Sequence, residues 1–201
     1  MQQIRKIVEK REIVQVVSVH ESSFSNFFMT ELGSYFLTVY YKSVSHNKNS
    51  ILLGCYEDDS LLGFCAATYL SKGFYKKLIK ENFLHYFFIS IYLLLSKPAS
   101  LIRLIKNLTK KNPEISDNGE YAELLSIATS VDSQGKGIGK KLLLQLEVEL
   151  KLKSCTELSL TTDYYDNDKV ISFYKNLSYN PLYDFVSYPN RKMYRMIKNI
   201  I

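Results

Sequence analysis

The chain has 201 residues, 46% of them hydrophobic and 23% charged, which is typical of one globular α/β domain with a continuous core. The net charge of +6 comes from one segment, because residues 71–111 hold nine Lys or Arg and one acid. The rest of the chain has a net charge of −2. The three cysteines lack zinc or redox spacing and the three histidines have no neighbouring ligands, so we expect no metal.

The N-terminal half predicts a β-α-β-β order. Residues 1–12 are charged throughout and lack the apolar run of a secretion signal, so we expect the protein in the cytoplasm. A run rich in β-branched residues predicts a strand over 13–20, and the aromatic stretch 24–44 predicts one or two helices. Two apolar runs, 51–56 and 61–70, flank an acidic turn and predict a hairpin.

A basic and apolar segment at about 71–112 looks like a helical insertion in a single domain that covers 1–201. Its middle, residues 83–95, is almost wholly apolar but too short to span a bilayer, which takes about 20 helical residues. One interpretation is a pair of helices broken near Lys97-Pro98 and packed as a lid or core extension. The other is a membrane-surface element whose cations favour anionic lipid. Residues 111–119 read as a polar loop.

The C-terminal half alternates strands and helices. We expect strands over 122–129 and 156–162, helices over 138–153 and 168–177, and two final strands between 179 and 197. Alternating apolar residues in 138–153 would also suit a strand, but the length and the Leu, Lys, Gln and Glu content favour a helix. The order strand, loop, helix, strand predicts parallel pairing through a crossover.

A glycine loop joins the strand at 122–129 to the following helix. Glycines let the backbone approach a ligand closely, and the N-terminus of a helix attracts an anion, so a phosphate is the expected guest. Gln134 and Lys141 stand where a P-loop needs glycine and a hydroxyl residue, and Lys140 stands where a dinucleotide fingerprint needs its third glycine.

The loop resembles the acetyl-CoA loop of the GNAT superfamily, in which Gln or Arg is followed by two residues, Gly, one residue, and Gly or Ala. Gln134, Gly137 and Gly139 fill this pattern, and a helix led by Asn167 with Phe173-Tyr174 near its end resembles the second signature. The resemblance covers about residues 122–179. It implies a mixed α/β fold (α+β by some schemes) with a central twisted sheet flanked by helices, and acetyl-CoA as cosubstrate. The cofactor-binding residues it implies are Ile127, Ala128, Thr129, Gln134, Gly135, Lys136, Gly137, Ile138, Gly139, Lys140 and Asn167.

Two positions depart from the family pattern. Residues 130–133 (SVDS) replace the frequent Asp-Pro start of the loop, and Ser178 replaces a helix-ending glycine. Neither change removes a chemical group, although Ser178 weakens the C-cap.

The resemblance also implies catalytic roles. Glu123 is the candidate base for the amine, the N–H near Ala128 could hold the thioester oxygen, and Tyr174 is the candidate acid for the leaving sulfur. Three of the implied site residues also have a structural interpretation. Glu123 could face solvent, Tyr174 could be a core aromatic, and Asn167 could serve only as the N-cap of its helix. Cys155 has no histidine nearby in sequence and is a poor nucleophile candidate.

These residues predict an acetyltransferase that acts on a primary amine of a small molecule, with an amino sugar carried by a nucleotide or lipid as one acceptor. A non-catalytic acyl-CoA-binding sensor is the alternative. Nucleic acid is not expected as a partner, because the basic segment is also apolar and lacks a reader motif. A homodimer and a membrane contact through 71–112 stay open.

Overall fold

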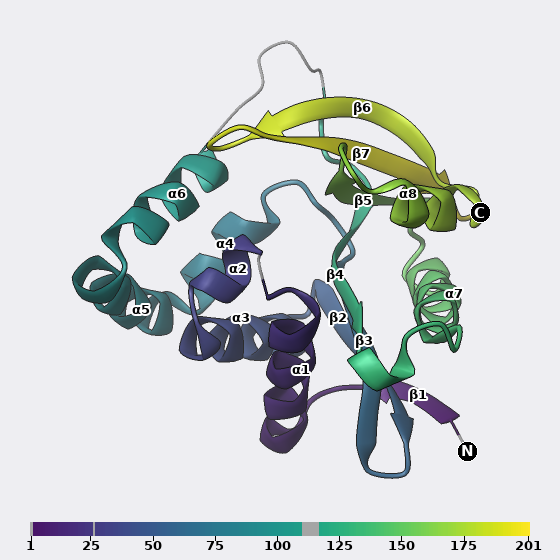
Figure 1. Ribbon diagram of the computed structural model, residues 1–201, viewed down its shortest axis with the longest axis horizontal. Helices are drawn as coiled ribbons and strands as arrows, with labels where there is room; N and C mark the ends of the chain where they lie inside the picture. The colour runs from purple at the N-terminus through teal and green to yellow at the C-terminus, as the bar shows by residue number, and fades with distance from the viewer. Residues whose placement is uncertain (1, 26, 110–116) are drawn as a thin grey trace.

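A computed structural model describes residues 2–25, 27–109 and 117–201. Its centre is a seven-stranded sheet in the order β1-β2-β3-β4-β5-β7-β6, in which β4 and β5 are parallel and all other neighbours are antiparallel (Figure 1). The mixed α/β fold that the resemblance implied is confirmed. The strands are β1 Gln2–Lys6, β2 Ser50–Glu57, β3 Ser60–Thr68, β4 Ala122–Thr129, β5 Glu157–Asp163, β6 Asn180–Ser187 and β7 Arg191–Asn199.

The strand predicted over residues 13–20 is wrong, because this segment lies in helix α1 (Lys10–Ser23) and the first strand is β1. Ile13, Val16, Val17 and His20 recur at helical spacing and are all buried, so the 3.6-residue period outweighs the β-branched composition. Glu12 closes a capping box with Glu9 at the start of the helix.

Helices cover both faces of the sheet. One face carries α1 and α3 (Ser34–His46), preceded by the short α2 (Phe28–Glu31), and the other carries α7 (Ile138–Lys151). Each layer has its own buried cluster: Val16, Leu37 and Phe64 belong to the first, and Leu142, Leu146 and Leu158 to the second. Of the cysteines, Cys55 and Cys65 are buried and Cys155 is partly exposed.

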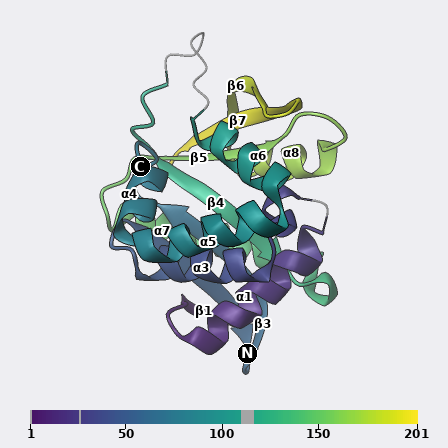
Figure 2. The same ribbon diagram turned by 90° about the vertical axis from the view of Figure 1, so that its left-hand side faces the viewer.

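The insertion forms three helices at one side of the molecule, α4 (Phe74–Glu81), α5 (Phe83–Ser96) and α6 (Pro98–Thr109) (Figure 2). The predicted break at Lys97-Pro98 is confirmed. Asn107 ties the end of α6 to the β6–β7 turn, because its Oδ1 accepts hydrogen bonds from Ser187 Oγ at 3.1 Å and from Tyr188 N at 2.9 Å. Residues 110–116, which include most of the predicted loop, lie outside the described residues.

The C-terminal elements follow the predicted order. The ambiguous segment after the glycine loop is helix α7, β5 follows it, and α8 (Asp168–Lys175) leads into the final hairpin of β6 and β7. The parallel crossover from β4 to β5 is confirmed.

The parallel pair β4–β5 is short. Only Ala122–Leu124 pair with Leu158–Leu160, after which β4 continues along β3 and β5 continues along β7. Leu125 is an extra residue in β4, because the register with β3 shifts between Leu124 and Ser126. A bulge of this kind bends a strand and increases its twist. The sheet therefore splits beyond Leu124.

Candidate functional site

Two adjoining cavities follow the split between β4 and β5. The first, about 570 Å³, lies over the glycine loop, and the second, about 400 Å³, lies between β5, β7, α2 and α6. Four residues line both cavities, which places their junction: Phe24, Ile127, Val170 and Tyr174.

The glycine loop forms one wall of the first cavity. Gly137 is the N-cap of α7 with φ of 76°, and Gly135 has φ of 75°, a left-handed region that glycine enters without strain. A Cβ at either position would meet nothing within 4 Å, so the loop backbone borders open space. The free N–H groups and positive end of α7 make this wall attractive to an anion.

Most of the predicted cofactor residues lie around the first cavity. Its lining includes Ile127, Ala128, Thr129, Gln134, Gly135, Gly137, Ile138, Gly139 and Lys140. Lys136 belongs to the loop but not to that lining. Asn167 lines the second cavity instead, and its Nδ2 donates to Thr162 Oγ1 at 2.7 Å and to the Asp163 carbonyl at 3.0 Å. It occupies the N-cap position of α8 without a side-chain cap bond.

Tyr174 stands at the junction of the cavities. It comes from α8, is 6% exposed, and packs edge-on against Phe173 and Tyr179. Burial raises the pKa of Tyr174 to about 12. The phenol therefore keeps its proton at neutral pH and can act as a hydrogen-bond donor at the point where the two cavities meet.

Glu123 lies apart from the described cavities. It belongs to β4, but neither lining includes it, and its carboxylate is engaged by Arg195 Nη1 at 2.5 Å and by the Ser71 hydroxyl. The side chains of the Glu123–Arg195 pair are mostly buried. Removing one partner of such a pair leaves an uncompensated charge, so a stabilising role accounts for this geometry.

A hydrogen-bonded chain of three side chains reaches the second cavity. Tyr41 Oη donates to Ser126 Oγ at 3.1 Å, and His20 Nδ1 lies 2.6 Å from Tyr41 Oη. With the phenol proton directed to Ser126, Nδ1–H is the donor to Tyr41, and His20 Nε2 keeps its lone pair. His20 is 3% exposed, lines the cavity, and its Nε2 has no partner among the described residues.

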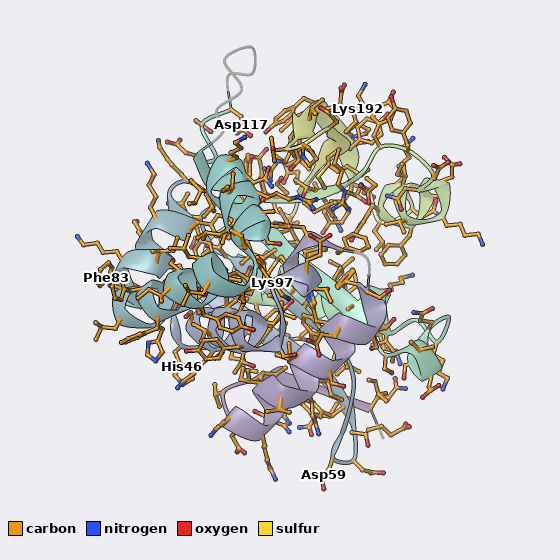
Figure 3. All side chains as sticks on the ribbon, turned by 60° about the vertical axis from the view of Figure 1, so that its left-hand side comes forward. His46, Asp59, Phe83, Lys97, Asp117 and Lys192 are labelled. Carbon is orange, nitrogen blue, oxygen red and sulfur yellow. The ribbon has the colours of Figure 1, made fainter. Side chains whose placement is uncertain are left out.

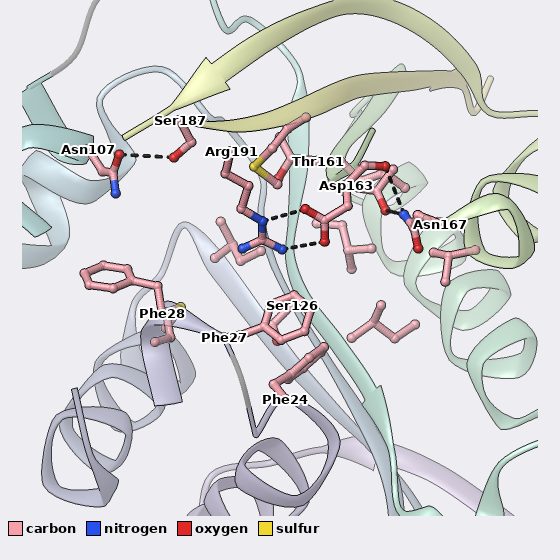
Figure 4. Close-up of a pocket in the computed structure, with 18 of the residues that line it drawn as sticks. Phe24, Phe27, Phe28, Asn107, Ser126, Thr161, Asp163, Asn167, Ser187 and Arg191 are labelled. Carbon is pink, nitrogen blue, oxygen red and sulfur yellow. Dashed lines mark hydrogen bonds and ion pairs between the residues drawn. The ribbon is translucent and has the colours of Figure 1, made fainter. Parts of the chain in front are cut away.

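The second cavity combines one ion pair with aromatic rings. Arg191 binds Asp163 through two hydrogen bonds, of 2.5 and 2.6 Å, and its guanidinium lies 4.7 Å from the centre of the Phe27 ring. Figure 4 shows this pair beneath β7, with the rings of Phe24 and Phe28 across the cavity. The site thus offers apolar faces, a cation and an anion to a polar ligand.

The sequence model of the acetyltransferase (GNAT) family matches residues 14–179. The chain belongs to the GNAT family. Among curated proteins no sequence matches.

Solved GNAT structures share the fold of this chain. A GNAT protein from Desulfovibrio desulfuricans superposes with a TM-score of 0.65 at 14% identity, and covers 100% of both chains. The ribosomal-protein-S18-alanine N-acetyltransferase of Escherichia coli gives a TM-score of 0.62 at 13% sequence identity, and the match covers 100% of this chain and 94% of that one. The PaiA N-acetyltransferase of Thermoplasma acidophilum, solved with coenzyme A, gives a TM-score of 0.58 at 18% sequence identity, and the match covers 99% of both chains.

Three predicted site residues, Ile127, Asn167 and Tyr174, line the second cavity of this GNAT protein, but the sequence did not predict His20, Asp163 or Arg191 there. His20 falls in the segment predicted as a strand, and only the helical recurrence of Ile13, Val16 and Val17 before it indicates a buried helix face. The Asp163–Arg191 pair left no local signal, because the two residues are 28 positions apart and meet through the register of β5 and β7.

His20 makes the stability of the protein depend on pH. Burial lowers the pKa of His20 to about 4, below its ordinary 6.5, so the unfolded chain binds more protons between these values. The stabilising effect is complete above pH 6.5 and is lost as pH falls towards 4, by up to about 3 kcal/mol. Urea unfolding at pH 4.5 and 7.5 should show this loss, and His20→Gln should reduce it. An equal loss of unfolding free energy in His20→Gln would contradict the assignment of this pH dependence to His20.

Proposed function

We propose that this GNAT protein transfers an acetyl group from acetyl-CoA directly to a primary amine of a small molecule. The observation that carries the proposal is the meeting of the two cavities at Tyr174, because a transferase needs donor and acceptor sites that share one reacting point.

The first cavity would hold acetyl-CoA. Backbone N–H groups of the glycine loop and the start of α7 suit a pyrophosphate, and the space above Gly135 and Gly137 admits a close approach. Beyond the split β4 no longer pairs with β5, so a pantetheine arm would lie along Ile127–Thr129, where the Thr129 carbonyl already accepts a hydrogen bond from Ser23 Oγ at 2.9 Å. CoA supplies the activated acetyl thioester, and the loop orients it towards the junction.

Tyr174 would serve the leaving sulfur. A thiolate forms when the C–S bond breaks, and a buried phenol at the junction can donate its O–H hydrogen bond and proton to it. Because burial raises the pKa of Tyr174 to about 12, the group is fully protonated when transfer begins.

Two side chains compete for the role of base. A primary amine is protonated at neutral pH and must lose a proton before its lone pair attacks the carbonyl carbon. Glu123 is the base that the family resemblance implies, but it is held by Arg195 and lies outside the described cavities. His20 lines the acceptor cavity with a free Nε2, and burial keeps its ring neutral, so we assign it the role of accepting a hydrogen bond from the amine.

The second cavity would select a polar acceptor. The Asp163–Arg191 pair can exchange hydrogen bonds with hydroxyl and amine groups, Thr161 offers a further hydroxyl, and the rings of Phe24 and Phe27 can pack on the flat face of a sugar. An amino sugar meets all three demands and is the acceptor class that we propose.

Glutamate at Gly137 should abolish acetyl-CoA binding, because it places a carboxylate where the loop would meet the pyrophosphate. Gly73→Glu is the matched control: Gly73 is also a left-handed helix N-cap with open space around it, so it takes the same backbone strain away from the site. Isothermal titration should show at least about a hundredfold weaker binding in Gly137→Glu only. Equal binding in both variants would make the loop a mere helix start.

Removal of the Tyr174 hydroxyl should slow transfer without loss of acetyl-CoA binding. We expect Tyr174→Phe to lower kcat by at least about 100-fold, in line with the loss of one acid group. Tyr179→Phe is the control, because it removes a neighbouring buried hydroxyl outside the two cavity linings. If acetyl-CoA binds tightly and no amine in a screen is acetylated by the unaltered protein, the chain is a sensor rather than an enzyme.

The base can be identified by comparing His20→Gln with Glu123→Gln. The first should lower kcat/KM at least about tenfold and move the acid limb of its pH profile, while leaving acetyl-CoA affinity intact. The second should lower the free energy of unfolding by about 3 kcal/mol, because Arg195 loses its buried partner. Full activity in His20→Gln together with inactive, folded Glu123→Gln would assign the base to Glu123.

A further inference from the structure

Helix α5 exposes an unusual amount of apolar surface. Tyr86, Ile89 and Leu93 face inward and hold the helix against α3 and α6, and Leu95 on the opposite side is 81% exposed. We call the exposed set, together with the outer residues of α6, the apolar ridge: Phe83, Leu84, Phe87, Phe88, Ile91, Tyr92, Leu94, Leu95, Ile102, Ile105 and Leu108. Figure 3 shows Phe83 at the outer edge of the molecule.

The ridge is wider than an ordinary surface stripe. At 100° per residue, the exposed apolar side chains of α5 cover about half of the helix circumference. Helices that face water usually alternate such a stripe with charged residues, yet α5 contains no Lys, Arg, Asp or Glu. A contiguous patch of this kind marks an interaction surface.

Cations border the ridge. Helix α4 meets α5 at an angle of 95° and carries Lys76, Lys77 and Lys80, all exposed and without an ion pair among the described residues. Residues 71–109 hold seven Lys or Arg and one acid. By contrast, Lys97 and Arg103 have partners within the protein, since Lys97 donates to the Glu31 carbonyl and Arg103 to the Glu31 carboxylate.

We propose that the apolar ridge and the α4 lysines dock on an anionic lipid surface. A second copy of the chain on the same patch would bring two sets of lysines together, whereas anionic headgroups complement them. The 14 residues of α5 extend about 21 Å, less than the roughly 30 Å of a bilayer core, which suits a helix lying in the interface.

No single helix among the described residues is long and apolar enough to cross a membrane. The bent pair α4 and α5 passes on length and composition only when both are taken together.

Docking would bring the acceptor cavity close to the lipid. Arg103 and Asn107 line that cavity from the inner side of α6, while Ile102 and Ile105 lie on its exposed side. A helix is about 10 Å across, so the cavity wall and the proposed lipid contact are two sides of the same helix.

Vesicle co-sedimentation tests the docking without reference to catalysis. The protein should bind vesicles of phosphatidylglycerol and phosphatidylcholine, and bind vesicles of phosphatidylcholine alone at least about tenfold more weakly. A first triple variant, with Leu84→Gln, Phe88→Gln and Leu95→Gln, should weaken vesicle binding at least about tenfold. A second triple variant, with Lys76→Gln, Lys77→Gln and Lys80→Gln, should also weaken vesicle binding and reduce its dependence on salt concentration. All six side chains are exposed, so these variants should fold.

A matched control replaces three exposed apolar residues on the opposite side of the molecule, Leu144, Val148 and Leu152 in and just after α7, by glutamine (Figure 1). This control should bind vesicles like the unaltered protein, and circular dichroism should show all variants folded. No binding to anionic vesicles, or equal loss in the α7 control, would overturn the proposal. Sedimentation as a dimer that the α5 variant converts to monomer would assign the ridge to a second copy instead.

Discussion

The short parallel pairing of β4 and β5 is the constraint on which the site depends. Three residue pairs join the strands, and the bulge at Leu125 then turns β4 away. Backbone N–H and C=O groups need partners, so a strand edge opened inside a protein is costly unless a ligand or water satisfies it. The split thus creates the room that the two cavities occupy.

The insertion forms one wall of the second cavity. Arg103 lies 4.4 Å from the centre of the Phe28 ring, Lys106 lies 4.3 Å from that of Tyr188, and Asn107 holds the β6–β7 turn. Elements from the N-terminal layer, the insertion and the last hairpin therefore share one cavity. The lining of the second cavity is set by contacts between segments far apart in the sequence.

Local patterns predicted the parts of the protein that depend on local physics. The glycine loop follows from the conformational freedom of glycine, and the break before Pro98 follows from the missing N–H of proline. The crossover from β4 to β5 follows from the order of elements along the chain, and all three features are present. The strand predicted over residues 13–20 is wrong because the helical spacing of the buried residues, and not their β-branched composition, determines the structure of this segment. Glu123 shows a further limit: the sequence gives its strand, but only tertiary packing brings Arg195 and Ser71 to its carboxylate.

Helix α6 faces two different environments. Its inner positions contribute Arg103 and Asn107 to the cavity, and its outer positions expose Ile102 and Ile105. Each added or deleted residue rotates the rest of a helix by about 100°, which would carry apolar side chains into the cavity and polar ones out of it. During divergence, α6 can therefore exchange side chains one at a time within each face, but a change in its length would alter the second cavity and the outer surface together.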